Sequence, residues 1–169
     1  HLDFRRQRQM CIRDRDINMF FVNSLKLSYN QKNNLLSNTW FNSIIDFYSK
    51  SKLDFLKLKT FGIQFLNDHL SSNLYYHGSH HTLDVLQSLD QICFHEKVKP
   101  ADFFILKTAV LFHDMGYIDQ YENNEKIGAK YAQKFLPEYG YSKSQIEKIS
   151  QLILATKVPQ KPKNKLEKI

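Results

Sequence analysis

Two short clusters of ionisable residues in the sequence have the side-chain types needed to hold a metal ion. The first contains His77 and His81, and the second is the adjacent pair His113 and Asp114. Imidazole nitrogens together with carboxylate oxygens suit divalent ions such as Mn, Fe, Co, Ni or Zn. Such an ion acts as a Lewis acid on a phosphoryl oxygen and lowers the pKa of its bound water. A neighbouring histidine could then protonate the leaving oxygen, because an unperturbed imidazole titrates near neutral pH.

The spacing within the first cluster is that of a helix face. His77 and His81 are four residues apart, so in one helix they would share a face, and Asp84 would follow three residues later. Each residue also has a simpler explanation. His77 could be a residue at the helix start that bonds to the backbone, and Asp84 an ordinary surface residue.

The second cluster closes an almost wholly apolar run, residues 103–112. An ionisable pair at the end of a buried segment is costly unless hydrogen bonds or a metal compensate for it. The alternative is a helix C-terminus, at which His113 interacts favourably with the helix dipole and Gly116 supplies a left-handed cap. Tyr117 and Tyr121 are expected to be packing aromatics rather than substrate contacts.

The elements that must position these residues are helices. Apolar residues recur at intervals of three and four along the chain, and no alternating strand pattern appears. The segment 101–115 is apolar on nearly every side, as in a central helix. We predict an all-α, single-domain bundle of about six helices, over residues 35–49, 53–69, 79–96, 101–115, 125–136 and a last one opened by the capping box Ser142–Gln145.

Composition excludes several classes of protein. The chain of 169 residues is 42% hydrophobic and 14% aromatic, which excludes a disordered protein, and no apolar run is long enough to span a membrane. The net charge of +7 is concentrated in residues 1–15 and from Lys157 onward, so the body offers no basic face for nucleic acid. Two cysteines make no disulfide framework, so a cytoplasmic location is expected.

Residues 1–15 differ in composition from the rest of the chain. They contain all five arginines, whereas the remainder uses lysine alone as its basic residue apart from histidine. We predict that this segment is a non-native leader, with a basic disordered arm as the alternative. Residues 16–73 would then supply N-terminal helices that pack on a core of residues 74–169.

Three motifs carry a resemblance to a known family. They are Tyr76-His77-x-x-x-His81-Thr82, then Leu111-Phe112-His113-Asp114-Met115-Gly116-Tyr117, then Ala155-Thr156-x-x-Pro159. In this order they resemble the HD-domain metal-dependent phosphohydrolase superfamily, chiefly its small bacterial members, over about residues 74–169. The predicted all-α class agrees with that family's fold.

The resemblance implies roles for particular residues. His81, His113 and Asp114 would be metal ligands, and Asp114 would also take part in catalysis. His77 would be the general acid, as in the similar cyclic-nucleotide phosphodiesterases. Where di-metal members place a histidine before the next helix, this chain has Asn124-Glu125. That difference favours a single metal, or puts Glu125 in the histidine's place as a bridging or base carboxylate. The helix dipole explains Glu125 equally well.

The resemblance also leads us to expect a missing ligand. The family's last ligand is an aspartate, expected shortly beyond a Leu-Glu-Lys-Ile sequence, and this chain stops at Ile169. We therefore expect the core 74–169 to be incomplete at its C-terminal end. A fragment that lacks one ligand should bind metal weakly and position its water poorly, which would reduce activity.

Three functions follow as predictions. The first is a metal-dependent phosphohydrolase that acts on a small phosphorylated substrate, with a nucleotide among the candidates and Mn, Fe, Mg, Co, Ni or Zn as the ion. The second is a non-catalytic regulatory HD domain that senses a nucleotide or metal. The third, a helical interaction protein without a site, requires the imidazoles of His81 and His113 to lie more than about 10 Å apart, since ligands sit about 2 Å from an ion. Substrate, metal identity and oligomeric state stay open.

Overall fold

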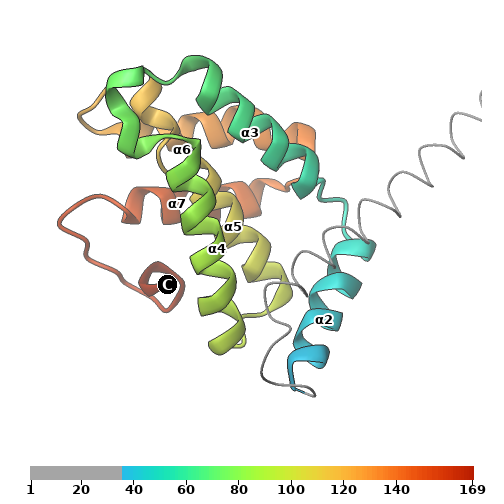
Figure 1. Ribbon diagram of the computed structural model, residues 1–169. Helices are drawn as coiled ribbons and strands as arrows, with labels where there is room; N and C mark the ends of the chain where they lie inside the picture. Colours follow the sequence, from blue (N-terminus) through green and yellow to red (C-terminus); the bar gives the residue numbers. More distant parts are fainter. Residues whose placement is uncertain (1–35) are drawn as a thin grey trace, which may run out of the picture. The chain divides into compact units, whose positions relative to one another are not determined.

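The computed structural model describes residues 36–169, with side chains from residue 39 onward, and this part of the chain is all-α. The predicted leader, residues 1–15, lies outside the described residues. No strand occurs among the described residues, so the predicted all-α bundle is confirmed for them. Six α-helices follow one another: α2 Leu36–Lys50, α3 Phe55–His69, α4 Ser79–His95, α5 Pro100–Phe112, α6 Asn124–Phe135 and α7 Lys143–Ala155 (Figure 1). Four short 3₁₀ helices lie between and after them: η1 Ser72–His77, η2 Met115–Ile118, η3 Leu136–Tyr139 and η4 Leu166–Lys168.

The chain divides into two compact units, residues 1–45 and residues 46–169. The boundary falls inside α2, and the second unit contains α3 to α7 whole. All residues predicted to do chemistry belong to this second unit. The divisions predicted at residues 15 and 73 stay predictions. Among the described residues, no helix has the length and apolar character needed to cross a membrane.

Helix α5 is the centre of the second unit, as its sequence predicts. Pro100 occupies the first helical turn after an extended Lys99, a position at which its missing N–H costs no hydrogen bond. The helix contacts α3, α4, α6 and α7. Its apolar side chains are buried on all sides, which fixes the direction in which its C-terminal end points. The buried residues are Phe103, Phe104, Ile105, Leu106, Ala109, Leu111 and Phe112.

The end of α5 differs from the prediction. The helix ends at Phe112 rather than at residue 115, so His113 and Asp114 occupy the turn that joins α5 to η2. Met115, the next residue, is fully buried. The apolar pattern therefore continues past the helix end, because it reports burial and not the hydrogen-bonding pattern of the backbone.

Two glycines allow the turn to pack against α6. A Cβ on Gly116 would lie 1.8 Å from the carbonyl oxygen of Asn124, and one on Gly128 would lie 2.7 Å from the carbonyl oxygen of Phe112. The predicted left-handed cap at Gly116 is wrong. The glycine with a positive φ among the described residues is Gly140 (φ 83°), which follows η3. Gly116 is needed for the close approach of two backbones.

Candidate metal centre

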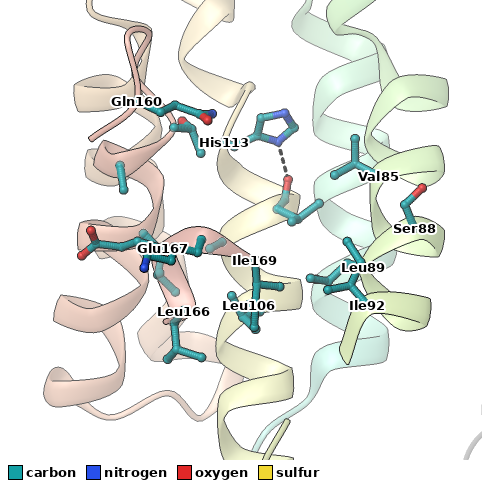
Figure 2. Close-up of a pocket in the computed structure, with 16 residues that line it drawn as sticks. Val85, Ser88, Leu89, Ile92, Leu106, His113, Gln160, Leu166, Glu167 and Ile169 are labelled. Atoms are coloured by element: carbon teal, nitrogen blue, oxygen red, sulfur yellow. Dashed lines mark hydrogen bonds between the residues drawn. The ribbon is translucent and has the colours of Figure 1, made fainter. Parts of the chain in front are cut away.

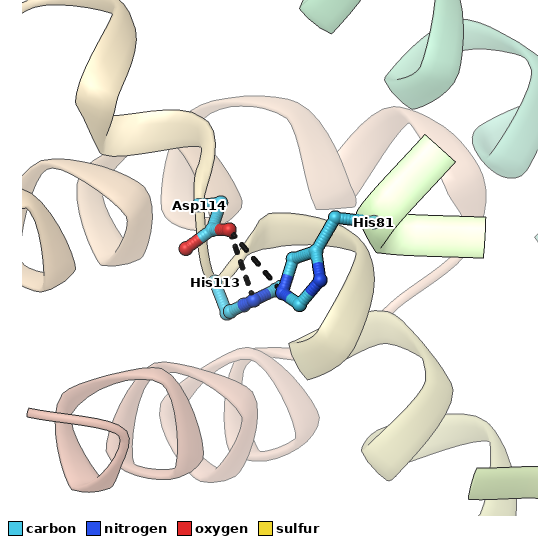
Figure 3. A group of neighbouring side chains, drawn as sticks. All are labelled: His81, His113 and Asp114. Carbon is cyan, nitrogen blue, oxygen red and sulfur yellow. Dashed lines mark ion pairs between the residues drawn. The ribbon is translucent and has the colours of Figure 1, made fainter. Parts of the chain in front are cut away.

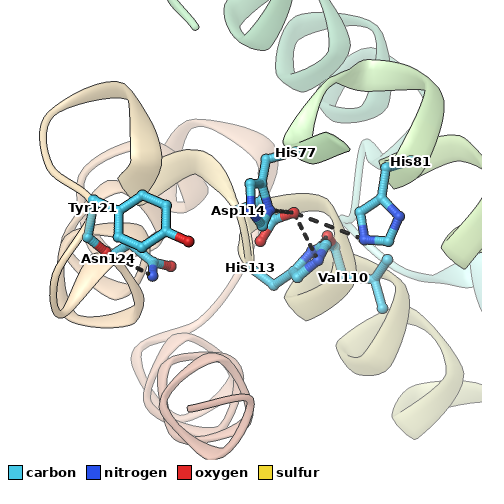
Figure 4. A network of polar contacts seen from close by, with 7 residues as sticks. All are labelled: His77, His81, Val110, His113, Asp114, Tyr121 and Asn124. Carbon is cyan, nitrogen blue, oxygen red and sulfur yellow. Dashed lines mark hydrogen bonds and ion pairs between the residues drawn. The ribbon is translucent and has the colours of Figure 1, made fainter. Parts of the chain in front are cut away.

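Asp114 is the point at which the two predicted clusters meet. Its Oδ2 lies 3.0 Å from His77 Nδ1, 3.2 Å from His113 Nε2 and 3.8 Å from His81 Nε2 (Figure 4). The Asp114 side chain is only 8% exposed. One carboxylate oxygen thus faces three imidazoles in a largely buried position. A carboxylate in such a place requires compensation by cations, by hydrogen-bond donors or by a metal.

Three of these residues have the geometry of a ligand set. One side-chain atom from each of His81, His113 and Asp114 can be chosen so that all lie within 4.8 Å of one another (Figure 3). Nitrogen and oxygen ligands at about 2.1 Å from a tetrahedral ion lie about 3.4 Å apart. The two imidazole-to-carboxylate distances, 3.2 Å and 3.8 Å, lie on either side of that value. The chemistry of the donor set therefore fits one divalent ion.

The backbone of α5 sets the tautomer of His113. Its Nδ1–H donates a hydrogen bond to the carbonyl oxygen of Val110 at 2.6 Å. This bond leaves Nε2 as the ring atom that faces Asp114 and His81. Metal-binding histidines commonly donate their second ring N–H to a carbonyl or carboxylate, which fixes the ring and raises its basicity as a ligand.

His81 enters from the first turn of α4. Its ring centroid lies 5.6 Å from that of His113. This distance is well below the separation of about 10 Å that a protein without a site would require. The observed spacing therefore argues against the third predicted function, a helical interaction protein with separated histidine clusters.

The electrostatics of the group favour a charged carboxylate. Burial would raise the pKa of Asp114, but its contacts with His113 and His77 outweigh burial and lower that pKa overall. Burial likewise opposes protonation of His113, yet the hydrogen bond and charge of Asp114 raise the His113 pKa overall. For His81, burial prevails over Asp114 and lowers the pKa. These shifts favour the neutral imidazole at His81 and the protonated one at His113, so a metal that bound here would compete with a proton at His113 more than at His81.

His77 contacts the same Asp114 Oδ2 atom, but from η1 rather than from α4. It is the last residue of η1, and Gly78 is extended (φ −75°, ψ 177°) before α4 begins at Ser79. His77 and His81 therefore do not belong to one helix, which was the condition for a shared helical face, although both contact Asp114. The ring of His77 stacks on Tyr117, with centroids 3.9 Å apart and planes 26° apart. His77 lies outside the three-residue ligand group found among the described residues.

Glu125 is close enough for its charge to act on Tyr117, and it also lies outside the ligand group. It occupies the first turn of α6, and its Oε2 is buried without a hydrogen-bond partner. Burial raises the pKa of the Tyr117 hydroxyl, and the charges of Asp114 and Glu125 contribute to the same shift. Buried carboxylate oxygens in native proteins nearly always have a partner, so this oxygen has the capacity to accept a bond from water, from another donor or from a cation. Asp84 is exposed and lies outside the ligand group as well.

An apolar pocket opens beside His113. It has a volume of about 290 Å³ and is lined from α4, α5, α7 and the C-terminal segment (Figure 2). Val85, Leu89 and Leu106 form part of its apolar wall. The pocket leaves one side of the His113 ring facing an open space with a mainly apolar wall. The sequence pattern indicates that these residues are apolar, but not that they enclose a space.

Comparisons of the chain with protein-family models, with curated proteins and with solved structures found no match. The resemblance to HD-domain phosphohydrolases therefore stays a prediction. Two parts of the centre were not foreseen in the sequence. The Val110 carbonyl is a backbone group, for which side-chain type gives no signal. The stacking of Tyr117 on His77 depends on the turn at Gly116, and a tyrosine directly after that glycine was the available clue.

Proposed function

We propose that the protein is a metal-dependent phosphohydrolase of the HD-domain type, which cleaves a phosphomonoester or phosphodiester with a metal-activated water. The observation that carries the proposal is the contact of three imidazoles with one buried Asp114 oxygen, with His113 held by Val110 so that its Nε2 is free to bind. Three protein ligands with open positions for water and substrate are the usual arrangement in catalytic metal sites.

Each side chain has a role in this proposal. Nε2 of His81, Nε2 of His113 and the carboxylate of Asp114 hold a divalent ion. The ion supplies Lewis acidity toward a phosphoryl oxygen and a hydroxide near neutral pH. Asp114 also keeps the charge of the group balanced, since its lowered pKa ensures that it is ionised.

His77 is proposed as the general acid. Its Nδ1–H is held by Asp114, and its side chain is 19% exposed. The stack on Tyr117 fixes the ring plane, so Nε2 is the atom left to give a proton to the leaving oxygen. Glu125 is proposed as a carboxylate that receives a proton from water, because its Oε2 is buried and unpaired.

Metal content and hydrolysis test the proposal together. The wild-type chain and the variants His81→Asn, Asp114→Asn and His80→Asn would be loaded with Mn²⁺ and dialysed, and the metal bound per chain would be measured. His80 is the matched control, because it neighbours His81 on α4 but is exposed and outside the ligand group. We expect wild type and His80→Asn to bind Mn²⁺ with equal affinity, up to about one ion per chain. We expect a loss of at least about tenfold in affinity in the other two.

Turnover would be measured on 4-nitrophenyl phosphate and bis(4-nitrophenyl) phosphate with the same proteins. Hydrolysis that depends on Mn²⁺ and is lost in His81→Asn and Asp114→Asn supports the proposal. Metal binding without turnover on either ester, also in a longer chain that supplies the family's expected last aspartate, favours the regulatory alternative, a domain that senses a metal or nucleotide. Equal metal content in wild type and Asp114→Asn refutes the proposed centre.

A further inference from the structure

The candidate metal centre has an aromatic rim. Seven large hydrophobic side chains are exposed in the described part of the chain, and the three aromatic ones are Tyr75, Tyr76 and Tyr121. The other four, all aliphatic, are Leu83, Ile92, Leu154 and Val158. Single exposed hydrophobic residues are normal on a protein surface. Two of the three exposed aromatics, Tyr76 and Tyr121, have ring contacts that lead to the cluster around Asp114.

Tyr76 touches the ligand group directly. Its ring centroid lies 4.5 Å from that of His81 with planes 33° apart, and 5.3 Å from that of His77 with planes nearly perpendicular. The side chain is 67% exposed. One side of the ring is therefore covered by a metal-binding histidine, whereas much of the rest is open to solvent.

Tyr121 borders the other side of the centre. It lies 66% exposed in the turn before α6, and its ring contacts Tyr117, which in turn stacks on His77. In Figure 4, Tyr121 stands on one side of Asp114 and His81 on the other. A molecule whose phosphoryl group sits at Asp114 would have Tyr76 near it at His81, and Tyr121 near it beyond Tyr117.

We propose that the substrate is a phosphoester whose organic group contains a planar ring, and that this ring stacks on the open face of Tyr76. The inference rests on the proposed function, since it places the phosphoryl group at the metal centre. Stacking of a base on an aromatic side chain changes affinity by factors of roughly 5 to 150 on alanine substitution. Such a ring also matches the usual make-up of a ligand site, in which aromatic walls surround a few polar groups.

The test uses two ligands that share a sugar and a phosphate but differ in the ring. Adenosine 5′-monophosphate and ribose 5-phosphate would be titrated into the Mn²⁺-loaded protein, and their dissociation constants compared. We expect adenosine 5′-monophosphate to bind about tenfold more tightly in wild type. That ratio should fall close to one in Tyr76→Ala and be preserved in Tyr76→Phe, because phenylalanine keeps the ring.

Tyr75 is the matched control. It is 79% exposed and contacts His80 with a centroid distance of 4.6 Å and an angle of 33°, much like Tyr76 on His81. Because His80 is outside the ligand group, Tyr75→Ala should leave the ratio unchanged. Bound Mn²⁺ per chain, measured in all variants, shows that the centre itself is intact.

The outcomes separate this proposal from the one it rests on. If neither phosphate binds the Mn²⁺-loaded protein, the proposed function fails and the ring proposal fails with it. If both bind equally tightly to wild type, the phosphate site stands and the ring proposal is refuted. The assignment to Tyr76 is wrong if the ratio of the two dissociation constants is unchanged in Tyr76→Ala but is lost in another variant. Loss in Tyr121→Ala would place the ring at Tyr121, and loss in Leu89→Gln would place it in the apolar pocket.

Discussion

The buried ion pair between α4 and α5 offers the sharpest test of what holds the second unit together. Lys107 Nζ lies 2.5 Å from Asp90 Oδ1, and its side chain is 5% exposed. The ammonium also lies 5.2 Å from the ring centroid of Phe103 and 5.8 Å from that of Phe55. The substitution Lys107→Met keeps the length and apolar character of the side chain but removes its charge. The Asp90 carboxylate would lose this partner while it remains largely out of water.

The structure gives the magnitude and the direction of the effect. Breaking a buried pair by removing one charge costs about 3–5 kcal/mol. For a chain of this size that corresponds to a fall in Tm of about 6–20 °C. Burial raises the pKa of Asp90 and lowers that of Lys107, in both cases against the attraction of the partner. Both shifts favour the neutral forms, so the pair as a whole adds little net stability. The double variant Asp90→Leu with Lys107→Met should therefore be about as stable as wild type, or more so.

Urea unfolding followed by circular dichroism would measure these free energies. Lys148→Met is the control, because Lys148 pairs with Asp102 at 2.6 Å but with side chains 45% and 25% exposed, and exposed pairs contribute under about 1 kcal/mol. A loss below about 1 kcal/mol in Lys107→Met would refute the reasoning. A double variant as unstable as the single one would show that the loss comes from packing rather than from an uncompensated charge.

Three further predictions concern the candidate centre and its supporting turn. Gly116→Ala should destabilise the protein by more than about 2 kcal/mol, because the new Cβ would lie 1.8 Å from the Asn124 carbonyl oxygen. A thermal melt would measure this loss, and a change below about 0.5 kcal/mol would contradict the close approach. Without metal, the lowered pKa of Asp114 adds stability above its ordinary pKa of 3.8, and this stability is lost as pH falls through the lowered pKa. The raised pKa of His113 adds stability below its ordinary pKa of 6.5, and this stability is lost as pH rises through the raised pKa. The rise in Tm caused by Mn²⁺ should thus be larger at about pH 8 than at about pH 5.5, because Mn²⁺ binding displaces the His113 proton. A larger rise at about pH 5.5 would count against His113 as a ligand. When free Mn²⁺ is present at a hundred times its Kd, its removal should lower the unfolding free energy of wild type by about 2.7 kcal/mol. The same removal should have little effect on His81→Asn, and a calorimetric scan would measure both changes.

Helix positions could be predicted from the sequence wherever a local signal fixes an end. Pro100 begins α5, and the capping box is present in full at α7, where Ser142 Oγ accepts from the Gln145 N–H and the Gln145 side chain accepts from the Ser142 N–H. The end of α5 had no such signal, since buried residues continue through Met115. A periodic pattern predicts which face is buried, and a helix end inside a buried run depends on tertiary packing, here the approach of Gly116 to Asn124.

The ligand group could be predicted by residue type, but residue type and spacing alone did not separate the roles of His77 and His81, which only the resemblance assigned. A spacing of four residues in one continuous helix would give His77 and His81 the same orientation, as two equivalent ligands. The extended backbone at Gly78 breaks that equivalence. It leaves His81 on α4 with Nε2 near Asp114, and it turns His77 so that Nδ1 contacts Asp114 while the ring stacks on Tyr117. On the proposed function, this break is what allows one histidine to bind the metal while the other donates a proton. A substitution that extended α4 back through residue 78 should therefore impair the general acid more than it impairs metal binding.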